Sequence, residues 1–170
     1  MRFLRCILLG GFLISFCGCA GYRLGPTNNQ SAGDKTVQIV PITNQTLDPE
    51  LGDAVTAALR KELQRDATYR LTAEDSADIV VTGTVTKYNR QALTFQPNDV
   101  ITARDYRVSL TATFSARERS TGKLIFSREV TGQTLTRVGS DLTSTERQAL
   151  PLLANDLARR VVAMLADGTW

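Results

Sequence analysis

Arg90, Arg104 and Arg137 are the side chains of this sequence that are best suited to bind a ligand. A guanidinium group donates paired hydrogen bonds to a phosphate or a carboxylate, so a cluster of three could hold a phosphorylated lipid headgroup or an acidic partner. These residues are far apart in sequence, and they meet only if the chain between them forms up-and-down antiparallel strands. The alternative interpretation is that they are exposed arginines that keep the protein soluble.

The sequence has few of the residues and motifs that are typical of an enzyme or a metal site. It contains no histidine, which removes the commonest general base and the commonest metal ligand. It has no glycine-rich phosphate loop, and its densest group of carboxylates, Glu74, Asp75 and Asp78, lies in a predicted turn. We therefore expect a protein that is not an enzyme and that needs no cofactor or metal.

Residues 1–18 have the features of a lipoprotein signal peptide. A positively charged start precedes an uncharged apolar run, Cys6–Phe16, which is too short to span a hydrocarbon core about 30 Å thick. The motif Phe16-Cys17-Gly18-Cys19 resembles a bacterial lipobox, in which the last cysteine is acylated and becomes the mature N-terminus. Cys19 is therefore the expected lipid-attachment site, although Phe16 stands where lipoboxes usually have leucine. The alternative is an ordinary cleaved signal peptide without lipid.

Acyl chains on Cys19 would anchor the protein in a membrane, because each buried CH₂ group contributes about 0.8 kcal/mol. Ala20 follows in place of aspartate, which by analogy with Gram-negative bacteria favours the outer membrane, on its periplasmic side. Loss of Arg2 and Arg5 from the 20 basic residues leaves 18 against 17 acidic ones. This balance, together with export, disfavours a nucleic-acid partner.

The rest of the chain predicts one α+β domain, with residues 19–35 as a lipidated N-terminus and tether and residues 36–170 as the domain. The expected elements are strands at 36–42, 79–95, 106–117 and 124–137, and helices at 49–66 and after Ser144. Residues 44–48 are expected to form a loop, and 69–72 at most a brief strand.

The predicted order is β-α-β-β-β-α, with two amphipathic helices on one face of a four-stranded, mostly antiparallel sheet. The first strand should pair in parallel with one of the later strands, because a helix connects it to them. In residues 106–117, apolar and polar side chains alternate, which predicts one buried and one wet face. In such a meander, Arg90, Arg104 and Arg137 come to the same edge, around the loop Gln96–Val100.

Several segments resemble the lipopolysaccharide-assembly lipoproteins, the small partners of the outer-membrane lipopolysaccharide translocon. The likeness covers most of the mature chain. Two of the similar segments come early: a CGYxL-like start, Cys19-Ala-Gly-Tyr-Arg-Leu-Gly25, and a first strand that ends in Asn-x-Thr, Thr36–Thr46. The other two are the helix that follows, Leu51–Leu63, and a strand of the pattern AD-x-x-x-x-G-x-V, Ala77–Val85.

The resemblance implies two helices on a four-stranded sheet, a position as a plug inside a large β-barrel partner, and a role in moving lipopolysaccharide to the outer leaflet. It also implies that basic residues at a loop end of the sheet bind the phosphates of the lipid. No family motif assigns that role to particular positions, so Arg90, Arg104 and Arg137 are a prediction from strand geometry.

A second resemblance comes from the strand Val37-Gln-Ile-Val-Pro-Ile-Thr-Asn-Gln-Thr46 and the helix after it. Curli-secretion and peptidoglycan-synthase-activator lipoproteins, which are oligomeric pore-formers or enzyme regulators, begin in the same way. Those domains alternate strands and helices, whereas here three strands are expected in succession. A periplasmic hydrolase is disfavoured, because a nucleophile would lack its usual histidine base.

Overall fold

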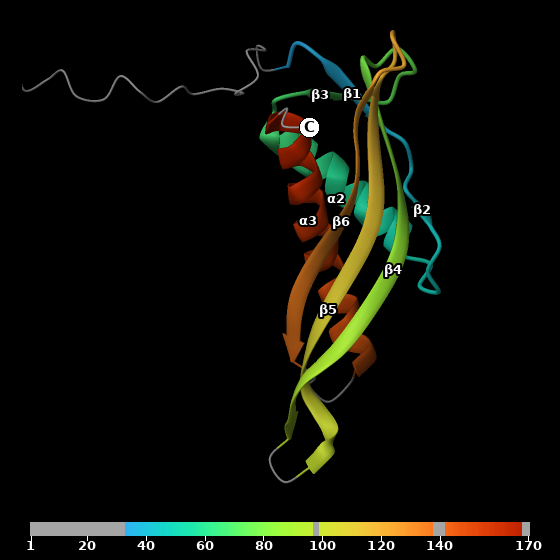
Figure 1. The fold of residues 1–170 in the computed structure, drawn as a ribbon. Coiled ribbons are helices and arrows are strands. Elements are labelled where there is room, and N and C mark those ends of the chain that lie inside the picture. Colours follow the sequence, from blue (N-terminus) through green and yellow to red (C-terminus); the bar gives the residue numbers. More distant parts are fainter. Residues whose placement is uncertain (1–32, 97–98, 138–141, 168–170) are drawn as a thin grey trace, which may run out of the picture.

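The protein is a mixed β-sheet covered on one face by two helices, as shown by a computed structural model that describes residues 33–96, 99–137 and 142–167 (Figure 1). The expected signal peptide, Cys19 and the tether up to residue 32 lie outside the described residues, as do Pro97 and Asn98 of the expected loop.

The sheet has the spatial order β3-β1-β4-β5-β6, and β2 pairs with β4 beyond the end of β1. Strands β4, β5 and β6 form an antiparallel meander, whereas β1 runs parallel to both β3 and β4. The elements are β1 Thr36–Ile39, β2 Thr43–Asn44, α2 Leu51–Asp66, β3 Arg70–Thr72, β4 Ile79–Gln96, β5 Asp99–Glu118, β6 Leu124–Arg137 and α3 Leu142–Asp167.

The expected α+β class, the two helices and the mostly antiparallel sheet are confirmed, but the count of four strands and the order β-α-β-β-β-α are wrong. Arg70–Thr72 joins the sheet as an edge strand beside β1, and Thr43–Asn44 pairs with β4 where a loop was expected. Pro41 lacks an N–H group and interrupts the first strand, which resumes pairing with β4 after one extra residue. The observed order is β-β-α-β-β-β-β-α.

The core lies between the helices and the apolar face of β5. Val108, Leu110, Ala112, Phe114 and Ala116 are fully buried, and they alternate with polar residues as the sequence predicts. Against this face the helices bury leucines, alanines and valines at helical spacing, among them Leu51, Val55, Leu59 and Leu63 of α2 and Leu153, Leu157 and Val161 of α3.

The helix α3 packs directly against β6 at Gly132. A Cβ atom at this glycine would lie 2.8 Å from the Leu153 carbonyl oxygen and 3.0 Å from the Leu157 backbone nitrogen. Backbone atoms cannot rotate away as a flexible side chain can, so glycine is what permits this close approach.

Strands β4 and β5 extend well beyond the helix layer as a twisted hairpin (Figure 1). We call its outer part, together with the end of β6, the distal end of the sheet: residues 87–96, 103–108 and 134–137. The turn that joins β5 to β6 lies at the opposite end, near the start of β1.

We predict that Gly132→Ala lowers the free energy of unfolding by about 1–3 kcal/mol, because the added methyl group forces α3 away from β6. Urea unfolding followed by circular dichroism measures the change. The exposed neighbour provides a matched control, since Gln133→Ala should shift stability by no more than about 0.5 kcal/mol. Equal urea midpoints for the two variants would contradict the prediction, because they would show that α3 can move away from β6 without loss of stability.

Candidate docking face and basic distal end

The sheet face opposite the helices is polar over most of its length, and Leu135 is an exposed apolar residue on it; we call it the open face. Because directly paired residues share a face, its members follow from the strand register. They are Thr82, Thr84, Lys87, Asn89 and Gln91 of β4, Arg107, Ser109, Thr111, Thr113, Ser115 and Arg117 of β5, and Ser127, Glu129, Thr131, Gln133, Leu135 and Arg137 of β6.

Hydroxyl groups on the open face bond to one another across the strands. Oγ atoms lie 2.9 Å apart for Thr82 and Ser115, 3.0 Å apart for Thr111 and Thr131, and 2.7 Å apart for Thr43 and Thr84. A hydroxyl that donates to its neighbour keeps lone pairs free for other donors. The open face is therefore an ordered polar surface, suited to wet, hydrogen-bonded contact with another molecule.

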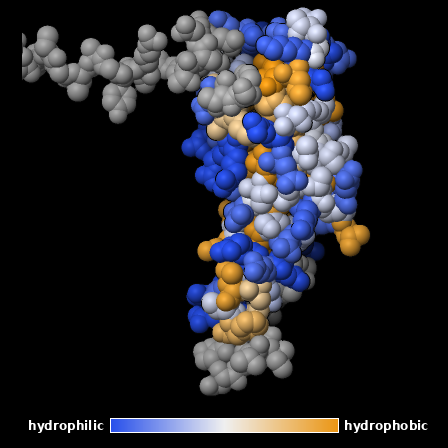
Figure 2. Space-filling model, in the orientation of Figure 1, coloured by the Kyte–Doolittle hydropathy of each residue, from blue (hydrophilic) through white to orange (hydrophobic). Residues whose placement is uncertain are grey.

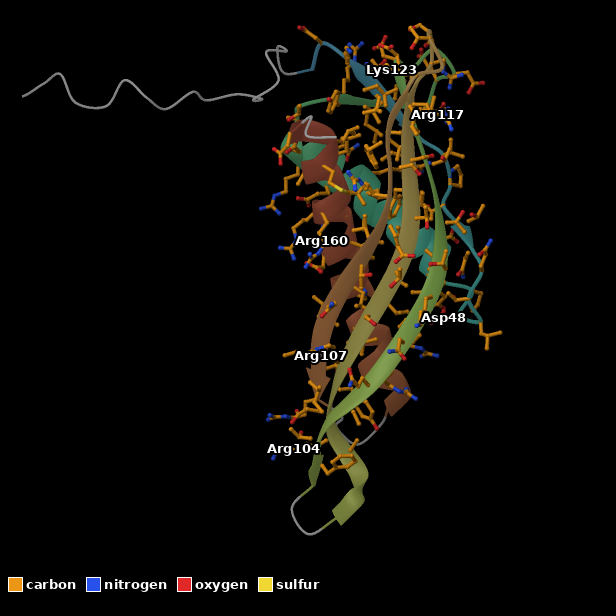
Figure 3. All side chains as sticks on the ribbon, viewed as in Figure 1. Asp48, Arg104, Arg107, Arg117, Lys123 and Arg160 are labelled. Carbon is orange, nitrogen blue, oxygen red and sulfur yellow. The ribbon has the colours of Figure 1, made fainter. Side chains whose placement is uncertain are left out.

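The three arginines singled out from the sequence lie at the distal end, but not on one face. Arg90 pairs with buried Val108, and its guanidinium carbon lies 5.5 Å from the centre of the Tyr106 ring, on the helix side. Arg137 lies on the open face. Arg104 falls at an irregularity, where Asp105 pairs with Thr94 and Ala103 with Phe95. It is exposed near the end of the hairpin, and Arg107 lies above it (Figure 3).

Arg137 is held by a carboxylate. Its Nε donates to Asp105 Oδ1 at 2.8 Å, and the Thr94 hydroxyl donates to the other carboxylate oxygen at 2.5 Å. The bond from Arg137 is the largest reason that the pKa of Asp105 lies below its ordinary value, followed by the bond from Thr94. Part of the charge of Arg137 is therefore used within the protein. Arg104 also lowers the pKa of Asp105 through its nearby charge, but no ion pair joins it to a described carboxylate.

An apolar groove of about 510 Å³ lies beside this ion pair, lined by Leu93, Thr94, Asp105, Leu135, Thr136 and Arg137. Leu135 is 68% exposed and Phe95 is 48% exposed, and apolar surface gathers toward this end of the molecule (Figure 2). The sequence analysis missed these residues. Leu135 could have been predicted as an exposed apolar residue, because it lies between Gln133 and Arg137 on the solvent-facing side of an alternating strand.

At the opposite end of the sheet, side chains form hydrogen bonds with backbone groups and with one another. Thr36 donates to Asp78 Oδ2 from its N–H and from its hydroxyl, each at 2.7 Å, and these bonds hold the pKa of the Asp78 carboxyl below its ordinary value. Arg119 donates to the Ala77 carbonyl and to Gln38. The carboxylate group noticed in the sequence thus has a structural role at Asp78.

Within the described ranges, no group of three or more acidic, cysteine or histidine side chains is arranged to hold a metal ion. No helix in the described part of the chain combines the length and the apolar character needed to cross a bilayer.

We predict that Arg137→Ala raises the pKa of Asp105 toward its ordinary value. In the wild type, the depressed pKa means that this carboxylate favours folding above its unfolded pKa and that the contribution fades as the pH falls through the folded value. The carboxyl ¹³C resonance of Asp105, titrated by NMR, measures the shift. Arg128→Ala, an exposed change on the same strand, should leave the titration in place; an unmoved midpoint in Arg137→Ala would refute the pairing.

The chain shares its fold with several solved structures of low sequence identity. The hypothetical protein CT253 from Chlamydia trachomatis is 12% identical, over 78% of this chain and 95% of its own, with a TM-score of 0.56. The PelC dodecamer from Paraburkholderia phytofirmans is 19% identical, over 83% and 93%, with a TM-score of 0.54. A minor lipoprotein from Acinetobacter baumannii is 18% identical, over 78% and 92%, with a TM-score of 0.53.

Among curated proteins, none matches the sequence. The model of one protein family does match, over residues 35–165, which cover most of the chain, including the whole meander, α2 and all but the last two residues of α3. That family is described as lipopolysaccharide-assembly, in agreement with the resemblance of the strand and helix motifs, and the chain belongs to this family, LptE.

Proposed function

We propose that this protein assists lipopolysaccharide assembly as the small plug partner of a large outer-membrane β-barrel translocon, without catalysing a reaction. Membership of the family is the main support for the proposal. The open face, which no element of the described residues covers, supports it further. One side of the sheet buries its apolar residues under two helices, whereas the other leaves a broad polar surface for a partner.

The chemistry of the open face matches the inside of a large barrel. Barrel interiors are polar and wet, and they offer hydrogen-bonding groups rather than apolar surface. The hydroxyls of Ser109, Thr111 and Thr113 lie in the middle of the open face, beside Lys87 and Glu129, and arginines are placed toward its ends. A contact of this kind would form through hydrogen bonds and bridging water.

A lipid on Cys19 would hold the domain at the periplasmic side of the outer membrane. The residues between Cys19 and Gly33, where the described chain begins, would serve as the tether. Confinement to the membrane surface raises the effective concentration of the domain near a membrane-embedded partner, so a weak, wet contact can suffice.

We assign lipopolysaccharide binding to the distal end. Arg90, Arg104 and Arg137 supply guanidinium groups for phosphates, and the groove beside Leu93 and Leu135 supplies apolar surface. Arg104 has the largest expected share, because Arg137 is already paired with Asp105 and Arg90 stacks on Tyr106.

A second candidate function is that of the curli-secretion or peptidoglycan-synthase-activator lipoproteins. The fold shared with PelC, whose structure is a dodecamer, favours an assembly of identical subunits. The uninterrupted succession β4-β5-β6, without a helix between these strands, favours the first proposal.

We predict that Thr113→Trp abolishes co-purification with a β-barrel from solubilised outer membrane. The indole would project from the centre of the open face and hold this face away from the inner wall of the barrel. The free energy of unfolding should change by no more than about 0.5 kcal/mol. Gln64→Trp, an exposed change on α2, provides the matched control and should retain the barrel.

Equal barrel recovery with both variants would place the contact elsewhere than on the open face. A ring of identical subunits in place of a barrel would favour the second candidate function.

We predict that Arg104→Glu weakens lipopolysaccharide binding by about tenfold or more, because it replaces attraction of a phosphate with repulsion. A pulldown on immobilised lipopolysaccharide measures the loss. Arg117 is also an exposed arginine of β5, but it lies at the opposite end of the strand (Figure 3). Arg117→Glu changes the net charge by the same amount and should bind lipopolysaccharide as the wild type does. Equal losses of binding in both variants would show that net charge, and not the position of Arg104, determines binding.

A further inference from the structure

We infer that a cleft beside the end of β1 binds a small organic molecule that carries one carboxylate group and an aliphatic body. We call it the β1 cleft, and its volume of about 660 Å³ lies within the range of ligand sites. Residues of β1, β3, β4 and α2 line it, together with the segment after β3 and Arg119. None of its lining residues belongs to the distal end, so the inference does not depend on the lipopolysaccharide site proposed above.

The β1 cleft exists because β3 ends before β1 does. Gln38 and Thr72 form the last pair between these two strands, whereas β1 continues to Ile39. The chain after Thr72 leaves the outer side of β1 and returns to the start of that strand, where Thr36 binds Asp78. Beyond Gln38, no described strand therefore pairs with the outer side of β1.

A guanidinium group from α2 lies on the helix side of the β1 cleft. The Val40 N–H donates to the Val81 carbonyl at 3.0 Å, so the backbone groups of Val40 face β4 and, by alternation, those of Ile39 face the cleft. There the Ile39 carbonyl accepts a hydrogen bond of 3.3 Å from Arg60 Nη2. This bond occupies one of five N–H donors, and Arg60 forms no ion pair with a described carboxylate. The remaining donors suit a carboxylate, which a guanidinium binds through paired hydrogen bonds.

On the open-face side of the cleft, a second guanidinium is already engaged. Arg119 donates from Nη2 to Gln38 Oε1 at 2.6 Å and from Nε to the Ala77 carbonyl at 3.2 Å. Gln38 in turn donates from Nε2 to Asp75 Oδ1 at 3.1 Å. Arg119 and Asp75 thus lie on either side of one glutamine side chain, and their opposite charges offset each other. The only other charged residue that lines the cleft is Arg60, so the net charge of the cleft is positive and comes from that side chain.

Aliphatic side chains line the cleft between these polar groups. Leu71 pairs with buried Val37 and packs against the core on the helix side, whereas Val80 pairs with Gln38 on the open-face side. Pro41 adds a ring that has no N–H group. A phosphate would bring a second negative charge, which the carboxylate in the cleft opposes. A monocarboxylate with an aliphatic body matches both the charge and the surface of the cleft.

The test titrates the full chain, labelled with ¹⁵N and held in a non-ionic detergent, with hexanoate. We expect hexanoate to shift the amide resonances of Ile39 and Ala73 and the Nε resonance of Arg60 in a saturable way. Hexanamide has the same body without the charge and should bind at least about tenfold more weakly. Inorganic phosphate has charge without the body and should also bind at least about tenfold more weakly.

Arg60→Gln removes the guanidinium group and should weaken hexanoate binding at least about tenfold. Arg65→Gln is the matched control, because Arg65 is also an exposed arginine of α2 but does not line the cleft. This control should bind hexanoate as the wild type does. Unchanged amide resonances of β5 and β6 in both variants show that the sheet is intact.

Hexanoate shifts that do not saturate, or that lie away from the β1 cleft, overturn the inference. Hexanamide or phosphate that binds as tightly as hexanoate overturns the assigned class of ligand. Equal losses of hexanoate binding in Arg60→Gln and Arg65→Gln overturn the role of Arg60, because they show that the charge of α2 as a whole attracts the carboxylate.

Discussion

The alternation of side chains along β5 is the constraint on which the rest of the structure depends. Burying Val108, Leu110 and Phe114 under the helices turns Ser109, Thr111 and Thr113 to the other side of the sheet. A slip of one residue would invert both faces, so the core that fixes the register also creates the open face. The polar character of the open face is therefore a consequence of packing, and it requires no separate structural feature.

The second feature of consequence is a difference in length between the sheet and its helix layer. Strands β4 and β5 extend past the helices, and what lies beyond them combines guanidinium groups, exposed leucines and unpaired backbone (Figure 1). Tyr106 marks the transition, since it still packs against the core while Arg90 lies over its ring. One geometric property thus provides the candidate lipid-binding end, whereas the opposite end of the sheet is held by the bonds between Thr36 and Asp78.

Periodicity alone was enough to predict the elements with long, regular patterns. The strand Leu124–Arg137 has the expected bounds, and the parallel pairing of the first strand follows from the helical connection. Arg70–Thr72 is too short to show a period, and its place beside β1 comes from tertiary pairing. The same limit applies to the arginines. Meander topology brings them to one end, but the bulges at Thr86 and near Leu93 decide which face each one takes, and no local pattern reveals a bulge.

The route of the chain explains why one edge of the sheet is covered and the other is not. After β6 the chain returns as α3, which can lie close to this strand because Gly132 has no side chain, and Asp156 then occupies the Gln133 donor. On the β4 side, the chain leaves the edge at Gln45, enters α2 and returns as β3 at the opposite end of the sheet. No further described element follows β4 outward. Past Val85, the outer side of β4 therefore has no strand partner among the described residues, and unpaired backbone groups on a sheet edge are the groups that recruit other strands.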